Sequence, residues 1–279
     1  MALESFSVTR TLMLEVISAC HASLSYEKTT PPTFTDKYEE RAYLKHRLAL
    51  AFRIFAKFGF AEGVAGHITV RDPVDPTSFW VNPFGLHFSL IEDGDLMRVD
   101  NEGKVVDGGK NRRLDYVIEL IAAYAIHAQI HAARPKVLCA AHSHTTYGRA
   151  ICGTGKTLQP LTQDSCVFYD DHVLYYNFAG VVLVSEEGKR IVVTLGSKKV
   201  DLLGNYGLLI VALSVEICVA WFVLFESCCE VQLLAEANWN TWEALGEASG
   251  SYFMGLPLLQ VAERDFGERT FLGRGLEPA

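Results

Sequence analysis

Residues 137–152 read VLCAAHSHTTYGRAIC, and this stretch decides the fold class. Val137–Ala141 is a short apolar run typical of a buried strand, and Thr145–Cys152 has the length and spacing of a helix. His142 and His144 stand between them. A buried strand that leads directly into a helix is the unit from which α/β folds are built. The stretch therefore predicts an α/β fold with two histidines where a strand meets a helix.

The same alternation extends to both sides of this stretch. Upstream, apolar residues recur every three or four positions over 36–60 and 114–133, which predicts helices, and β-branched runs predict strands at 67–70, 79–81 and 96–99. Downstream we expect a strand at 181–184, a helix at 186–195, strands near 200 and 208–211, and a helix from Ser214 to about Trp239. A three-layer α/β/α sandwich around a central mixed sheet fits this order best.

The 279 residues divide into three predicted parts. Residues 1–36 end in TTPPTFTD, whose pair Pro31-Pro32 blocks helix formation, so they are interpreted as an N-terminal arm. Residues 37–240 carry the alternating pattern and form the α/β domain. Residues 241–279 are poorly patterned and are interpreted as a C-terminal extension.

The charge and hydropathy of the chain exclude two classes of partner. The chain has 25 Lys and Arg against 33 Asp and Glu, and a net charge of −8 repels nucleic acid. Residues 207–225 are apolar enough to suggest a membrane span, but Glu216 near the bilayer centre would cost roughly 2.5 kcal/mol or more. We therefore expect a buried strand followed by a core helix here, and no membrane partner.

The cysteines and the N-terminus indicate the compartment. Seven cysteines form no C-x-x-C pair, and no secretory leader precedes them. An odd number of scattered thiols suits a reducing environment. We expect a cytoplasmic protein.

The histidine pair is the first candidate for chemistry. Residues i and i+2 of a strand project to the same side, so the rings of His142 and His144 can converge on one ion. Open α/β sheets place ligand groups at such strand ends. His127 and His131 also share a helix face, although a structural role for them is the simpler interpretation. His172 follows two aspartates and is a further candidate ligand, ranked after the histidine pair.

Four runs carry a resemblance to a known family. They are EGVAGHITVRDP (62–73), FWVNPFGLHFSLIEDGDL (79–96), AIHAQIHAARPKVLCAAHSHT (125–145) and GNYGLLIV (204–211). In this order and spacing they resemble the class II aldolase/adducin family, most of all its fungal branch, over about residues 40–237. The resemblance implies an α/β/α sandwich that assembles as a homotetramer with active sites between subunits.

The resemblance also implies a divalent metal, usually zinc, with manganese or iron as alternatives, held by three histidines. His142 and His144 match the first two ligands. The third belongs to an Asn-His-Gly-Leu-Leu segment, where this chain has Tyr206. Several interpretations are open at this point. Tyr206 binds the metal as a phenolate, or His67 takes the place of the third ligand, or the site binds metal weakly or not at all. Tyr206 as a proton donor, and Tyr206 as a buried aromatic without a chemical role, are also open.

A second departure concerns the acid/base residue. Sugar-phosphate aldolases of the family carry a glutamate where this chain has Ser89, and His87 lies close enough in sequence to substitute. The resemblance therefore implies a metal-dependent lyase acting on a small carbonyl or carboxylate compound by aldol chemistry or decarboxylation, with secondary metabolism as a setting. A non-catalytic adducin-like assembly protein and a metal-independent isomerase or cyclase are the alternatives.

Overall fold

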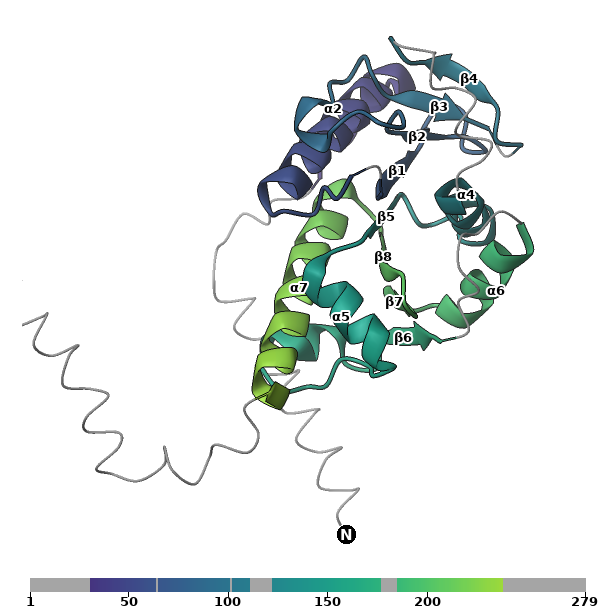
Figure 1. Ribbon diagram of the computed structural model, residues 1–279. Coiled ribbons are helices and arrows are strands. Elements are labelled where there is room, and N and C mark those ends of the chain that lie inside the picture. The colour runs from purple at the N-terminus through teal and green to yellow at the C-terminus, as the bar shows by residue number, and fades with distance from the viewer. Residues whose placement is uncertain (1–30, 64, 101, 111–121, 177–184, 238–279) are drawn as a thin grey trace, which may run out of the picture. The chain divides into compact units, whose positions relative to one another are not determined.

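The computed structural model describes residues 31–63, 65–100, 102–110, 122–176 and 185–237, without the side chains of 122–124 and 185 (Figure 1). The chain divides into two units, residues 1–36 and 37–279, and the fold below belongs to the second. The predicted strand at 181–184, the start of the predicted helix at 114–133 and the predicted C-terminal extension lie outside the described residues, as does most of the predicted arm.

One eight-stranded sheet organises the domain. Its strands in chain order are β1 (His67–Arg71), β2 (Phe79–Val81), β3 (Met97–Val99), β4 (Val105–Gly108), β5 (Cys139–Ser143), β6 (His172–Tyr175), β7 (Val200–Leu203) and β8 (Gly207–Ala212). They lie in the order β4-β3-β2-β1-β5-β8-β7-β6. Only β6 and β7 pair in parallel, and the other neighbours are antiparallel, so the sheet is mixed as predicted.

Helices cover both faces of the sheet (Figure 1). On one face α2 (Lys37–Lys57), α5 (Thr146–Thr154) and α7 (Val215–Ala237) enclose the larger core, in which Phe55 and Phe222 pack ring to ring at 4.7 Å. On the other face α4 (Ala122–Ala133) and α6 (Ser185–Leu195) close a second core through Ile126, Ile130 and Ile191. The predicted three-layer α/β/α sandwich is confirmed.

The strand that carries the histidines is shifted from its predicted position. It runs over Cys139–Ser143 instead of 137–141, because its five residues pair with β8 and the backbone N–H of Val137 is held by the carbonyl of Arg134 in a turn. His142 is therefore inside the strand, and His144 follows it. Strand β4 was not predicted, because Val105–Gly108 is short and only half buried.

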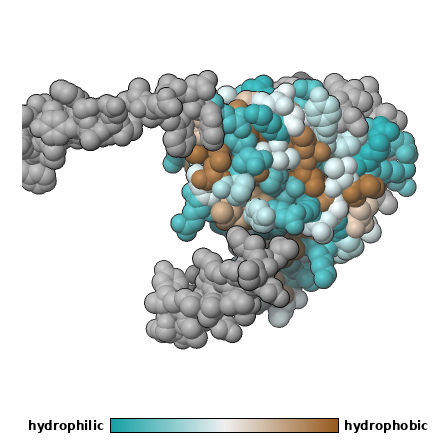
Figure 2. All heavy atoms as spheres, turned by 90° about the horizontal axis from the view of Figure 1, so that it is seen from below, coloured by the Kyte–Doolittle hydropathy of each residue, from teal (hydrophilic) through white to brown (hydrophobic). Residues whose placement is uncertain are grey.

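Helix α7 begins where the sequence predicts. The backbone N–H of Ile217 donates to the Ser214 hydroxyl at 3.2 Å, which is the hydrogen bond of an N-cap. By length and composition α7 is the one described helix that could cross a membrane, a test that a core helix of a soluble protein also passes. Its inner face is buried against the sheet and α2. Elsewhere, exposed apolar side chains lie among hydrophilic ones on the face shown in Figure 2.

Candidate metal and acid–base site

The antiparallel pairing of β1 and β5 brings two histidines together. His67 and His142 lie directly opposite each other in the register, so both side chains leave the same face of the sheet. His144 follows two residues later, and its ring centroid lies 5.0 Å from that of His142. The strand register and the two-residue spacing together place three imidazoles in one neighbourhood.

Tyr206 joins this group from the turn between β7 and β8. Its ring stacks on His142 at 4.5 Å and meets His144 edge to face at 4.6 Å. Asn205 adopts the left-handed conformation (φ 58°) that lets the chain reverse here. Gly207 follows, and a Cβ at this position would lie 2.5 Å from the carbonyl oxygen of Ser143, so only glycine permits this approach.

Hydrogen bonding fixes which nitrogen of His142 carries a proton. Its Nδ1 lies 2.9 Å from the carbonyl oxygen of Leu208, and a carbonyl only accepts, so Nδ1 is the protonated nitrogen. The Nε2 atoms of His142 and His144 are both buried without a hydrogen-bond partner among the described residues. Burial, with repulsion from neighbouring imidazoles for His142 and from Arg149 for His144, lowers the pKa of both rings. Both are therefore neutral bases with a free lone pair.

These two histidines fit a divalent ion, and the tyrosine fits a different role. A neutral imidazole whose other nitrogen donates to a carbonyl is the usual state of a metal-binding histidine. Within the described ranges no group of three or more His, Cys, Asp or Glu side chains is arranged to hold a metal. Burial raises the pKa of the Tyr206 hydroxyl, which opposes a phenolate ligand and keeps its proton available.

His67 is a neutral base beside this pair. Burial lowers its pKa to about 4, and the neighbouring Asn82 side chain only partly offsets this. Its ring centroid lies 6.4 Å from that of His127 on α4. At neutral pH the His67 ring is therefore uncharged, with a proton on one nitrogen and a lone pair on the other.

A second histidine pair lies behind His67. Thr69, two residues further along β1, has its Oγ1 atom 2.8 Å from His127 Nδ1 and 2.8 Å from His131 Nε2. The sequence placed both histidines on one helix face but missed Thr69. The signal was its position two residues after His67, which puts both side chains on one face of the strand.

Two further candidate histidines lie elsewhere. The exposed His87 accepts the backbone N–H of Ser89 at its Nδ1 atom and caps the short turn Phe88–Leu90. His172 is on β6, separated from β5 by two strands, and its Nδ1 lies 2.7 Å from the carbonyl of Phe168. In the described part of the chain no hydrogen bond or ring contact joins either to the group around His142. Their predicted roles stay predictions.

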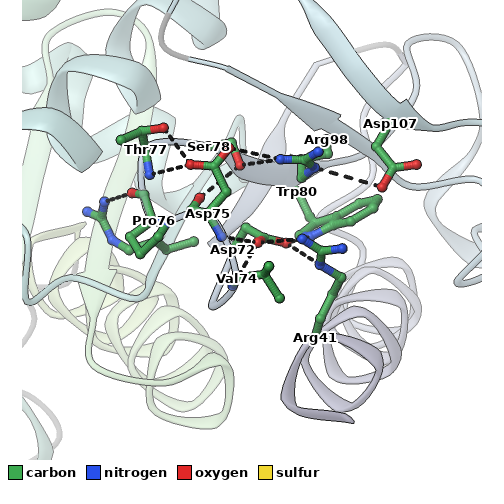
Figure 3. Close-up of polar contacts among 11 residues, drawn as sticks. Arg41, Asp72, Val74, Asp75, Pro76, Thr77, Ser78, Trp80, Arg98 and Asp107 are labelled. Atoms are coloured by element: carbon green, nitrogen blue, oxygen red, sulfur yellow. Dashed lines mark hydrogen bonds and ion pairs between the residues drawn. The ribbon is translucent and has the colours of Figure 1, made fainter. Parts of the chain in front are cut away.

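A buried ion pair anchors the far end of β1 (Figure 3). The carboxylate of Asp72 accepts two hydrogen bonds from the Arg41 guanidinium, at 2.7 and 2.9 Å, and one from Trp80 Nε1 at 2.6 Å. The backbone N–H groups of Val74 and Asp75 also donate to it. This network ties α2, β1 and β2 together and so fixes the strand that carries His67 and Thr69.

The comparisons with known proteins agree on one family. The family described as "Class II Aldolase and Adducin N-terminal domain" matches residues 46–233. The chain is 43% identical over 234 residues to "Decarboxylase NovR" of Streptomyces niveus, covering 81% of this chain and 84% of that protein. It is 46% identical over 209 residues to "4-hydroxy-3-prenylphenylpyruvate oxygenase/4-hydroxy-3-prenylbenzoate synthase" of Streptomyces roseochromogenus subsp. oscitans, covering 74% and 73%.

A solved structure shares the fold. "L-fuculose 1-phosphate aldolase from Glaciozyma antarctica PI12" superposes with a TM-score of 0.67 and 43% sequence identity, covering 86% of this chain and 96% of that chain.

Proposed function

Because the chain belongs to the class II aldolase and adducin family, we propose that it is a metal-dependent lyase that cleaves or forms a carbon–carbon bond next to a carbonyl group. The observation that carries this proposal is the pair of buried Nε2 atoms on His142 and His144, which have no hydrogen-bond partner in the part of the chain that the structure describes. Both lie on neutral rings, and the hydrogen bond to Leu208 fixes the tautomer of His142. Zinc is the first candidate ion, with manganese and iron as alternatives.

The metal and the side chains would divide the chemistry. A divalent ion held by His142 and His144 would supply Lewis-acid polarisation of a substrate carbonyl. Tyr206, whose hydroxyl keeps its proton because burial raises its pKa, would act as general acid toward a bound oxygen or carbon. His67, neutral at pH 7, would accept the proton that leaves the substrate. His87 stays a secondary candidate for that base.

The names of two relatives narrow the substrate class. One is a decarboxylase, and the other acts on a prenylated hydroxyphenylpyruvate, which is an aromatic 2-oxo acid. We propose a small aromatic 2-oxo acid as substrate. The secondary-metabolic setting and a cytoplasmic location belong to the same proposal, and the six described cysteines are free thiols that suit a reducing compartment.

Metal analysis tests this function directly. The purified protein is analysed for zinc, manganese and iron and then assayed with a panel of aryl 2-oxo acids, with and without oxygen, for release of carbon dioxide. We expect about one divalent ion per chain and turnover that a chelator abolishes. His142→Ala combined with His144→Ala should lose both, whereas His172→Ala, on the far strand β6, should keep both.

Three results would count against the proposed function. Metal-free protein with full activity would favour the metal-independent isomerase or cyclase. A double variant that keeps cellular function and assembly would favour the adducin-like role. Turnover that needs oxygen would assign the chain to oxygenation, as the name of one relative states.

A further inference from the structure

An ion pair between Arg149 and Glu62 lies beside the histidine pair. Arg149, on α5, donates from Nη2 to Glu62 Oε1 at 2.7 Å and from Nε to the carbonyl of Thr145 at 3.3 Å. Thr145 directly follows His144 in the chain. The side chains of Arg149 and Glu62 are 44% and 35% exposed. The guanidinium is therefore held next to His144 and is still open to solvent.

The loop that carries Glu62 packs against the end of β5. The Ser143 hydroxyl donates to the carbonyl of Phe60 at 2.6 Å. A Cβ on Gly66 would lie 3.2 Å from the carbonyl oxygen of His142, so the loop also passes close to the strand just before β1 begins. Backbone contacts on both sides of Glu62 thus fix its place relative to the histidines.

The charges of this ion pair act on the candidate metal ligands. Burial is the main cause that lowers the pKa of His144, the positive charge of Arg149 lowers it further, and the negative charge of Glu62 raises it. The charge effects on His142 come from neighbouring imidazoles. Of the cations in the part of the chain that the structure describes, Arg149 is the one whose charge acts on this pair of rings.

Arg149 has the capacity to bind a second anion. A guanidinium has five N–H donors, and the described residues accept two of them, one on Nε and one on Nη2. An ion pair between side chains this exposed contributes little to stability, so Glu62 can be displaced at small cost. A carboxylate matches the planar fork of arginine with two parallel hydrogen bonds, which makes it the preferred partner.

We propose that Arg149 binds the carboxylate of the substrate and that Glu62 holds the guanidinium in place until the substrate arrives. This inference rests on the proposed function, in which the carbonyl oxygen of a 2-oxo acid faces an ion on His142 and His144. The carboxylate of such an acid is attached directly to the carbonyl carbon, so its partner must lie close to the same histidines. The carboxylate of the substrate replaces that of Glu62, and no covalent bond changes. Arg149 thereby selects acids over uncharged compounds of the same shape.

Calorimetric titration tests the carboxylate site without turnover. Phenylacetate, an aryl carboxylate that has no oxo group, is titrated into the purified protein, and phenylacetamide is the uncharged comparison of nearly the same shape. Arg149→Gln removes the charge, and Arg149→Lys keeps the charge without the planar fork. Glu62→Gln removes the competing carboxylate and leaves the guanidinium in place.

Arg47→Gln is the matched control. The ion pair of Arg47 with Glu216 also has an N–O distance of 2.7 Å, and its side chains are 37% and 39% exposed. It joins α2 to the start of α7, which follows the end of β8 that lies away from the histidines. The control therefore breaks an equivalent ion pair outside the candidate site.

We expect phenylacetate to bind about 10-fold more tightly than phenylacetamide, or better. Arg149→Gln should weaken phenylacetate binding by about 10–100-fold, as the loss of hydrogen bonds to a charged group does, and Arg149→Lys should weaken it less. Glu62→Gln should strengthen it, and Arg47→Gln should match the parent. A parent that does not distinguish acid from amide, or an Arg149→Gln protein that binds the acid like the parent, would overturn the inference.

Thermal melting shows whether each variant is folded. If Arg149→Gln melts early, the opposite effects of Arg149→Lys and Glu62→Gln on phenylacetate binding still decide the result. Equal binding by the parent and both of these variants would then overturn the inference.

Turnover gives a second readout. With an active 2-oxo acid, Arg149→Gln should raise KM by a factor similar to its loss of phenylacetate affinity, with a smaller change in kcat, and Glu62→Gln should lower KM. A Glu62→Gln protein that loses kcat at unchanged KM would overturn the role given to Glu62. If phenylacetate binds through Arg149 but no 2-oxo acid is converted, the proposed function fails and the carboxylate site stands. If the parent is active and Arg149→Gln keeps its KM, this inference alone fails.

Discussion

The carboxylate of Glu226, in the middle of α7, accepts a hydrogen bond from the hydroxyl of Thr145, the residue that follows His144. The same carboxylate accepts the backbone N–H groups of Tyr147 at 2.9 Å and Gly148 at 2.8 Å. These are free donors of the first turn of α5, where a negative charge is favourable. Helix α7 therefore fixes the junction between strand and helix on which the histidine pair stands.

Removing this cap should destabilise the fold. We expect Glu226→Ala to lower the free energy of unfolding by about 1–3 kcal/mol, because buried donors lose their acceptor. Glu226→Gln, which keeps one acceptor oxygen, should lose less. Urea unfolding measures both, with Glu186→Ala as a control because its ion pair with Lys189 is exposed. An unchanged midpoint for Glu226→Ala would contradict the assignment.

The ionised carboxylate of Asp72 should stabilise the fold, and this stabilisation should be lost when acid protonates it. Burial alone would raise its pKa, but hydrogen bonds from Arg41, Asp75 and Trp80 outweigh this and hold the pKa below its ordinary value. The stabilisation is therefore complete above about pH 4 and falls as pH drops through the folded-state pKa. Asp72→Asn should lose about 3–5 kcal/mol at pH 7, because it leaves Arg41 without its buried partner.

The pH profile provides the check for Asp72. The gap in unfolding free energy between parent and Asp72→Asn should narrow as pH falls below about 4. A gap that stays constant down to the acid transition would show that hydrogen bonding, and not charge, supplies the effect.

Asp201 on β7 should give the opposite dependence of folding stability on pH. Burial raises its pKa to about 8, and the hydrogen bond from the Tyr175 backbone N–H offsets only part of this. Its folded pKa lies above the unfolded value near 4, so the folded state binds an extra proton between these pH values. Stability should fall as pH rises from about 4 to 8, by at most about 1.4 kcal/mol per pH unit, and level off above.

Asp201→Asn isolates this effect because the amide is neutral and of similar shape. The variant should gain stability relative to the parent as pH rises toward 8. Unfolding measured in urea at pH 5, 6, 7 and 8 gives the slope. Parallel profiles for the two proteins would mean that Asp201 stays ionised in the fold.

The order of elements followed from the sequence, but the ends of β5 did not. Hydrophobic periodicity located α2 and the Ser214 cap of α7, because these features are local. The limits of β5 depend on its partner β8, which no local pattern contains. Moving the ends of a strand along the chain leaves the alternation of its side chains unchanged, so the rings of His142 and His144 still lie together, with centroids 5.0 Å apart.

Only part of the candidate site could be predicted from the sequence, because only part of it depends on local patterns. The histidine pair and the tyrosine came from spacing and from the family resemblance. The contact of Thr69 with His127 and His131 joins a strand to a helix about 60 residues away in the chain, and Glu226 reaches α5 over a longer separation. Single-sequence patterns hold no information about such pairings.

The outer face of α7 should support assembly into a homo-oligomer. Opposite its buried face lie Leu213, Ile217, Ala220, Leu224, Ser227, Val231 and Leu234, all exposed or half-buried. They are spaced four and three residues apart in turn, which is the repeat that lets a helix pack against another helix. Glu216 and Glu230 lie at the edges of this face, and their negative charges disfavour its binding to an anionic membrane surface.

Charged substitutions in this stripe should shift the oligomeric state. We expect Val231→Glu with Leu234→Glu to lower the sedimentation coefficient toward that of a single chain, because burying two carboxylates in an interface is costly. Val193→Glu is the control, since Val193 is 80% exposed on α6. If the double variant and the control sediment alike, another surface holds the subunits together.

Restoring a histidine at position 206 should strengthen metal binding. Tyr206 lies against both His142 and His144, and burial keeps its hydroxyl protonated, so it is a poor third ligand. Tyr206→His adds a neutral nitrogen at the same turn, and we expect zinc affinity to rise by more than the roughly 10–100-fold that outer-shell partners supply. Competition with a chromogenic chelator measures this.

The same substitution separates binding from catalysis. If Tyr206 gives a proton, Tyr206→His should bind metal more tightly and yet turn over more slowly, and Tyr206→Phe should slow turnover without changing affinity. Tyr176→His, at an exposed tyrosine, should leave both unchanged. A Tyr206→Phe protein that loses its metal would mean that the phenol oxygen is a ligand after all, despite the cost of removing its proton in a buried place.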